Sequence, residues 1–259
     1  MIKTLLDADL TPSQLINRIK TLNMSAEVKK LANQLPKKTA RTFESSQQAE
    51  ILRRTNTHTG TLTLHCNEVG NISLKTPDNA PAPEHLYSVP GNSVLFSINA
   101  ASFSLQLYKL EDEHLTRGEL VIVDAGNPLF IDGTQTLFDS NVDGTGHSAF
   151  IGSVNFPDKS ADIYVFDRVS LQKIAWFPHD DSAARYLVSL ELLEAAQDPD
   201  ASRVAEELIY HYHPAVAWKA FQIIHLLNPA TALGYAPLLR NLQNTRLNEL
   251  LDQHGGEIA

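Results

Sequence analysis

The chain has 259 residues, of which 43% are hydrophobic and 20% charged, and its formal net charge is −9. This composition is that of a globular protein, and no apolar run approaches the roughly 18 residues that suggest a membrane span. The negative charge argues against a protein that coats nucleic acid through general attraction to phosphates, and a single cysteine, Cys66, leaves no intramolecular disulfide, so we expect a cytoplasmic location.

Residues 1–54 predict short amphipathic helices. Thr11 followed by Pro12 is a helix start signal, Ser25 repeats the signal, and a third helical segment is expected near Ser45–Arg54. Apolar residues recur at helical spacing after the two signals, at Leu15, Ile16, Ile19 and Leu22 and at Val28, Leu31 and Leu35. We expect an N-terminal helical arm.

This arm is basic and the rest of the chain is acidic. Residues 1–54 hold ten Lys and Arg against five Asp and Glu, a charge of +5, and the remaining residues hold 11 against 25, a charge of −14. Docking of the arm on the acidic body, or a solvated face, is the ordinary reason for such a division. The alternative is an acidic partner or nucleic acid bound through Lys37, Lys38 and Arg41.

From residue 55 to residue 177 the pattern changes to short segments rich in β-formers and separated by turn residues. The expected strands are Thr61–Leu64, Ser93–Ile98, Phe103–Tyr108, Leu120–Val123, Leu129–Asp132, Ala149–Val154 and Asp162–Val165. No segment of helical period and length separates these strands, which disfavours a parallel sheet with crossover helices. So many closely spaced strands predict a sandwich or a barrel.

From residue 178 to residue 259 helical periodicity returns. The expected helices are Ser182–Gln197, Ser202–Tyr212, Pro214–Leu227, Ala236–Asn244 and Arg246–Gln253. They are divided by prolines, which suit a first helical turn and disrupt a helix interior: Pro199, Pro214, Pro229 and Pro237. The stretch from His213 to Ile224 resembles the second half of a HEAT-type repeat. The region has room for one or two such units, fewer than the three or more that a free-standing solenoid needs.

Two segments at helix boundaries predict caps rather than chemistry. His211 and His213 precede the helix that starts at Pro214, and the acidic pair Asp180 and Asp181 precedes the first helix of the C-terminal region. A nucleophile elbow and a phosphate-binding loop are both absent from the sequence.

One loop fits the opening half of a calcium-binding loop. Asp139, Asn141 and Asp143 alternate ahead of Gly144, but Phe150 stands where the closing glutamate of such a loop would be. Asn, Asp and Gly are also the residues that a long turn prefers, so the sequence predicts a structural turn here.

Gly70, Glu84 and Gly91 recur at a spacing that resembles the first motif of the cupin superfamily, which runs from a glycine through two histidines and a glutamate to a second glycine. Thr76 and Asp78 stand at the two histidine positions. The family's second motif aligns on residues 124–129, where Leu129 stands at the histidine position. The chain thus has the glycines and the glutamate of the family's first motif but lacks three of the histidines that bind the metal.

The resemblance implies an α+β fold. An antiparallel cupin-like β-barrel, or jelly roll, would span residues 55–177, flanked by the N-terminal helical arm, 1–54, and a C-terminal region of HEAT-like helical hairpins, 178–259. The positions that mark the predicted barrel mouth, and a ligand-binding site there, are Thr76, Asp78, Glu84 and Leu129. A barrel without a metal can still hold a small ligand.

An alternative is a metal-dependent oxygenase, similar to the cysteine-dioxygenase-like cupins, in which iron or another divalent metal is held by non-standard ligands. The candidate ligands of such a rebuilt site are Asp78, Glu84, His65, His85 and His147. Convergence of at least three of these groups inside the barrel would favour the enzyme, and failure to converge would favour binding.

We therefore expect a metal-free, non-catalytic cupin-like module that binds a small-molecule ligand or a protein partner, and neither nucleic acid nor a membrane. Trp218 or Tyr212 on a helical surface would serve as the aromatic anchor of an interface, which includes the interface of a homodimer.

Overall fold

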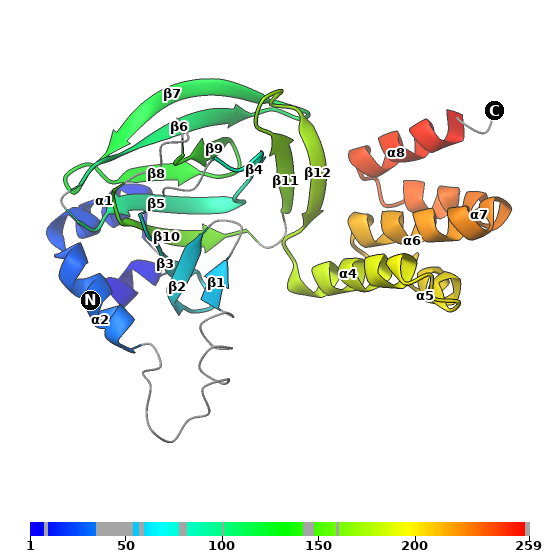
Figure 1. Cartoon of the computed structure of the whole chain (residues 1–259), viewed down its shortest axis with the longest axis horizontal. Coiled ribbons are helices and arrows are strands. Elements are labelled where there is room, and N and C mark those ends of the chain that lie inside the picture. Colours follow the sequence, from blue (N-terminus) through cyan, green and yellow to red (C-terminus); the bar gives the residue numbers. More distant parts are fainter. Residues whose placement is uncertain are drawn as a thin grey trace, which may run out of the picture. The chain divides into compact units, whose positions relative to one another are not determined.

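The computed structural model (Figure 1) describes residues 1–7, 10–34, 54–56, 60–77, 82–99, 101–141, 148–158 and 161–256. Contacts divide the chain into two compact units, and we call the first the β unit, formed by Met1–Lys159 with Tyr164–Ala175. The second, the helical unit, is formed by Ser160–Ile163 with Trp176–Ala259. Within the described ranges, no helix has the length and apolarity that crossing a membrane requires.

The β unit begins with a 3-10 helix, η1 (Ile2–Leu6), followed by α1 (Pro12–Thr21) and α2 (Met24–Gln34). The start signal at Thr11 is confirmed. The Thr11 hydroxyl accepts a hydrogen bond from the backbone N–H of Gln14, and the Gln14 side chain accepts one from the backbone N–H of Thr11, which forms a capping box.

The start signal at Ser25 is wrong. The side chain of Asn23 accepts a hydrogen bond from the backbone N–H of Ala26 at 3.0 Å, and α2 begins at Met24. Asn caps a helix as well as Ser does, so the sequence offered two adjacent caps and the earlier one is used. The helix expected at Ser45–Arg54 lies outside the described residues except for Arg54.

The strands of the structure are β1 (Thr55–Asn56), β2 (Thr61–Cys66), β3 (Asn71–Lys75), β4 (His85–Tyr87), β5 (Gly91–Ser97), β6 (Phe103–Leu110), β7 (Leu115–Val123), β8 (Leu129–Asp132), β9 (Thr136–Asp139), β10 (Ile151–Pro157), β11 (Asp162–Asp167) and β12 (Lys173–Pro178). They form a six-stranded sheet, β1-β2-β3-β10-β5-β8, and two three-stranded sheets, β12-β11-β4 and β7-β6-β9. The ladders of the six-stranded sheet, the β4–β11 pair and both neighbours of β6 are antiparallel. The expected α+β content with antiparallel sheets is confirmed, and closure into a barrel stays a prediction.

The six-stranded sheet has a hydrophobic core on each face, because successive side chains of a strand point to opposite sides. Phe96 and Val154 face η1, α1 and α2 and pack with Leu15 and Ile19 of α1. Leu95, the neighbour of Phe96, packs on the other side with residues of β6 and β7. In Figure 1, β6 and β7 lie above β5 and β10. The N-terminal helices therefore cover the face that is turned away from the second sheet.

Several strands were not expected from the sequence: β1, β3, β4, β9, β12 and the first half of β7. In β3 and β10, polar side chains alternate with apolar ones and bond to one another, as where Asn155 Nδ2 donates to Asn71 Oδ1 at 2.8 Å. The strand β7 lies at the edge of its sheet, and its residues from Thr116 to Leu120 are exposed. An edge strand of this kind lacks the alternation that a half-buried strand shows.

The helical unit consists of α4 (Asp181–Ala195), α5 (Ala201–Leu208), α6 (Pro214–Leu227), α7 (Pro229–Arg240) and α8 (Thr245–Gly256). α6 contacts the other four helices, and its side chains from Ala215 to Ala220 are buried except for Lys219. The expected bounds of α6 are confirmed.

The expected helix Ala236–Asn244 is wrong. α7 starts at Pro229 with Asn228 as its cap and continues through Pro237 to Arg240. Pro237 is exposed, so its ring is accommodated on the solvent side of the helix. Proline marks a probable boundary, and tertiary packing overrides that signal here.

Candidate functional site

The residues predicted at the barrel mouth lie on separate elements. Thr76 follows the last residue of β3 and is exposed, while Leu129 begins β8 and packs between the sheets; β10 and β5 separate these two strands. The Glu84 side chain is exposed, and its backbone carbonyl accepts a hydrogen bond from the backbone N–H of Arg168 at 3.0 Å. Asp78 lies outside the described residues. No hydrogen bond joins the three described members.

The described histidines of the alternative metal site lie on different sheets. His65 is in β2 opposite Ile72, whose side chain packs toward the N-terminal helices. Burial lowers the pKa of His65, and the charges of Lys3 and Arg54 lower it further. His85 is in β4 and pairs with Asp167 of β11. His147 lies outside the described residues.

The described members of this candidate set, His65, His85 and Glu84, form no metal-binding group with one another. Among the described residues, no three His, Cys, Asp or Glu side chains form a group that could hold one. His65 is turned toward the helix-covered face of its sheet, and Glu84 of the same candidate set is exposed next to another sheet. We therefore derive no chemistry through a metal.

An ion pair that the sequence did not suggest fixes the segment before β4. The Arg168 guanidinium bonds both carboxylate oxygens of Asp139, and its Nε donates to the backbone carbonyl of Pro83 at 2.6 Å. Asp139 Oδ1 also accepts a hydrogen bond from the backbone N–H of Asn141. Both oxygens of Asp139 are therefore bound to a cationic side chain. Asp143 and Gly144 of the predicted turn lie outside the described residues, so the turn stays a prediction.

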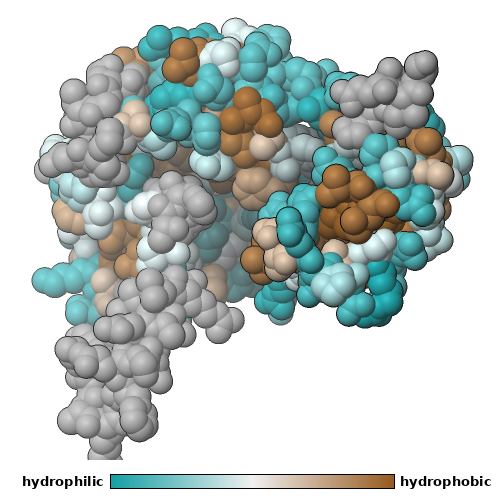
Figure 2. All heavy atoms as spheres, turned by 45° about the vertical axis from the view of Figure 1, so that its right-hand side comes forward, coloured by the Kyte–Doolittle hydropathy of each residue, from teal (hydrophilic) through white to brown (hydrophobic). Residues whose placement is uncertain are grey.

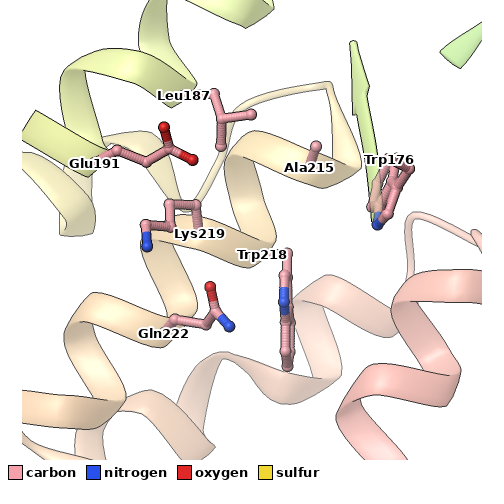
Figure 3. Close-up of a pocket in the computed structure, with 7 residues that line it drawn as sticks. All are labelled: Trp176, Leu187, Glu191, Ala215, Trp218, Lys219 and Gln222. Carbon is pink, nitrogen blue, oxygen red and sulfur yellow. The ribbon is translucent and has the colours of Figure 1, made fainter. Parts of the chain in front are cut away.

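The helical unit contains a cavity of about 150 Å³. It is lined by Trp176, Leu187, Glu191, Ala215, Trp218, Lys219 and Gln222, and we call it the tryptophan pocket (Figure 3). Trp176 comes from β12, two of the lining residues lie four apart on α4, and the other four follow helical spacing on α6. One face of each helix therefore forms the walls.

Both indole rings are held by aromatic neighbours. Trp218 is only 8% exposed and stacks on Phe221, with ring centroids 5.3 Å apart. Trp176 is half-buried and stacks on His213 at 6.2 Å. Figure 3 shows Trp176 and Trp218 on the right of the pocket and Glu191, Lys219 and Gln222 on the left. The pocket has an aromatic wall that faces a polar wall.

The polar wall carries one uncompensated charge. Lys219 Nζ is 2.6 Å from Glu194 Oε2, so its charge is paired. Among the residues that the structure describes, Glu191 has no ion-pair or hydrogen-bond partner, and it is exposed. A carboxylate thus stands free at the rim of an aromatic cavity.

His213, next to the pocket, caps helix α6, as the sequence predicts. His213 Nε2 lies 3.0 Å from Asp162 Oδ1, and its Nδ1 accepts a hydrogen bond from the backbone N–H of Ala215, which caps α6. Both ring nitrogens are therefore occupied, and none is left to accept a proton from a substrate.

Asp180 caps α4 in the same way. It accepts hydrogen bonds from the backbone N–H groups of Ser182 and Ala183, and the Tyr212 hydroxyl donates to its other oxygen at 2.8 Å. The Tyr212 hydroxyl, together with these two amides, holds the pKa of Asp180 below its ordinary value. The hydroxyl of Tyr212 is thus hydrogen-bonded to another residue of the helical unit.

The helical unit also exposes large apolar side chains. Figure 2 shows apolar side chains gathered on the helical unit. Its exposed large apolar residues include Leu192, Leu226, Leu227 and Leu233. Contiguous exposed apolar patches occur at protein or membrane interaction sites, at ligand-binding grooves and on aggregation-prone surfaces.

Trp218 was expected on a helical surface, whereas the structure buries it in the core cluster of the helical unit. Its role as an interface anchor stays a prediction, and Trp176 and Glu191 were not expected from the sequence. Trp176 is the fourth residue of a strand that was not expected, and Glu191 looked like an ordinary exposed position of an amphipathic helix. The spacing of the α6 residues that line the pocket was visible in the sequence. The face of α4 that lines the pocket could not be predicted from the sequence, because it depends on how α4 packs.

No protein-family model and no curated protein matches the chain. Among solved structures it is similar to the hydroquinone 1,2-dioxygenase PnpCD, with 8% identity and a TM-score of 0.31 over 48% of this chain and 82% of that chain. It is also similar to an RmlC-like cupin protein from Ralstonia eutropha JMP134, with 18% identity and a TM-score of 0.28 over 51% of this chain and 74% of that one. At these TM-scores the similarities do not define the fold, which is described by the strand pairing and cores given above.

Proposed function

We propose that the protein is a metal-free, non-catalytic interaction module, in which a cupin-like β unit is joined to a helical unit of HEAT-like hairpins. A partner protein docks at the tryptophan pocket. The observation that carries the proposal is this cavity, where both tryptophans of the chain line one wall. Tryptophan is enriched among the few residues that supply most of the binding energy of protein interfaces.

The size of the pocket favours a side chain over a whole cofactor. Its volume is about 150 Å³, whereas sites for small molecules and cofactors usually measure roughly 300–1,000 Å³. A cavity of this size accommodates one anchoring side chain of a partner, and the exposed apolar residues of the helical unit provide further contact area.

The surrounding chemistry supports binding rather than catalysis. The imidazole of His213 is bound at both nitrogens, and Asp180 is engaged by a helix cap and a tyrosine. The remaining titratable groups of the pocket are Glu191 and Lys219, and Lys219 is paired with Glu194. No nucleophile stands beside a base here.

The test is capture of a partner by immobilised protein from a lysate of its own cells, with a variant that fills the pocket. Gln222→Trp places a large ring in the cavity without removing a core side chain, and Gln253→Trp makes the same change on an exposed position of α8. We expect a partner retained by wild type and by Gln253→Trp and lost with Gln222→Trp. Equal retention by all three proteins would place the docking site elsewhere.

The metal-free part of the proposal is tested by metal content. Protein purified without an affinity tag or chelator is incubated with iron, manganese, nickel and zinc, and we expect substoichiometric metal that Asp78→Ala and Glu84→Ala leave unchanged. Near-stoichiometric metal that either substitution removes would favour the alternative, a metal-dependent cupin oxygenase with non-standard ligands.

A further inference from the structure

We infer that the side chain that enters the tryptophan pocket is an arginine, presented by a basic segment of the partner protein. The inference rests on the proposed function and names the chemistry of the docking residue. Two indole rings form one wall of the cavity, and Trp is the aromatic side chain that attracts a cation most strongly through its ring face.

The charges at the pocket select a cation. Lys219 is compensated by Glu194 at 2.6 Å, which leaves Glu191 as the free charge of the lining. Residues 176–259 as a whole hold 11 Asp and Glu against five Lys and Arg, a net charge of −6. A basic segment is therefore attracted before it docks, and an acidic one is repelled.

A guanidinium fits this lining better than the other candidate groups. Its plane stacks on an indole, and its fork of N–H donors matches a carboxylate such as Glu191 and an amide oxygen such as that of Gln222. An ammonium lacks the plane and the fork. An apolar side chain would cover Glu191 and offer its carboxylate no partner, which disfavours binding.

The chain provides its own reporter for the test. Trp176 and Trp218 are the only tryptophans, so selectively excited tryptophan emission comes from the pocket alone. The probe is a capped peptide of alternating arginine and glycine, titrated into the full chain. Its matched control is the same peptide with citrulline, the neutral isostere of arginine, at every arginine position.

We expect the arginine peptide to change the tryptophan emission saturably and to bind about tenfold more tightly than the citrulline peptide. Glu191→Gln should weaken arginine-peptide binding by about the same factor. Glu207→Gln, which removes the same charge from an exposed position of α5, should leave binding unchanged. Equal binding of the two peptides, or equal weakening by the two variants, would overturn the inference.

The two proposals fail separately. If the arginine peptide does not bind but Gln222→Trp still releases the captured partner, the choice of arginine is wrong and the docking site stands. If the arginine peptide binds in a Glu191-dependent way but the partner is retained by Gln222→Trp, the cation site is real and the proposed function is wrong.

Discussion

Gly152 and Gly234 are two glycines in opposite surroundings. A Cβ added to Gly152, in β10, would overlap the ring of Phe96, which is buried in the core beneath the N-terminal helices. A Cβ added to Gly234, in the interior of α7, meets no atom within 4 Å. The same substitution therefore has opposite physical consequences at the two positions.

We predict that Gly152→Ala lowers the free energy of unfolding by about 1–3 kcal/mol, because the Phe96 ring has to leave its packed position. Gly234→Ala should raise it by about 0.5–1 kcal/mol, since alanine removes the entropy cost of glycine in a helix. Urea unfolding of both variants measures the two changes. A Gly152→Ala variant as stable as wild type would show that Phe96 can move without loss, and a destabilised Gly234→Ala variant would contradict the second prediction.

The candidate site shows what single residues can and cannot reveal. Trp218 was predicted to lie on a helical surface, and the structure buries it against Phe221 at the wall of the pocket. Thr76, Glu84 and Leu129 were selected by motif spacing, and the structure leaves them on separate elements. Spacing along the chain fixes contacts within one helix or strand, whereas the pocket needs α4, α6 and β12 together.

At the scale of elements, prediction was most accurate where local signals are strong. Pro214 at the first turn and apolar residues along the whole helix fixed α6, and the expected strand Leu129–Asp132 is β8 as observed. Prediction was weakest for strands that are stabilised by contacts with neighbouring strands and have no clear pattern of their own. The strand β3 turns polar residues to one side, where they bond to β10, and an isolated segment of this composition does not indicate a strand.

The Glu27 side chain of helix α2 forms a hydrogen bond to the backbone of η1. Glu27 accepts a hydrogen bond from the backbone N–H of Ile2 at 2.9 Å and pairs with Lys30 at 2.6 Å. The bond to Lys30, followed by the bond to Ile2, lowers the pKa of Glu27 from 4.5 to about 2. Because the pKa is lower in the folded state, ionised Glu27 stabilises the fold above pH 4.5, and this contribution is lost as the pH falls toward 2.

We predict that Glu27→Gln lowers the thermal midpoint at neutral pH, and that its difference from wild type shrinks as the pH falls from 4.5 toward 2. Thermal melts across this range measure the difference. Glu68→Gln, an exposed glutamate between β2 and β3, controls for the loss of one carboxylate. A Glu27→Gln difference that stays constant with pH would contradict the role of its charge.

At the scale of the whole molecule, each unit has a hydrophobic core of its own. The buried cluster of the helical unit centres on α6, and the β unit has clusters between its sheets and under its N-terminal helices. A compact unit with its own hydrophobic core can unfold as a separate cooperative unit. Both tryptophans belong to the helical unit, so their emission follows the unfolding of that unit alone.

The two glycine variants test whether the units unfold independently. We predict that Gly152→Ala shifts the transition of the β unit, followed by hydrogen exchange of its strands, and leaves the tryptophan transition in place. Gly234→Ala should shift the tryptophan transition and leave the exchange of the strands unchanged. Because each substitution lies within one unit, a shift of both signals by either variant would mean that the two units unfold as one cooperative unit.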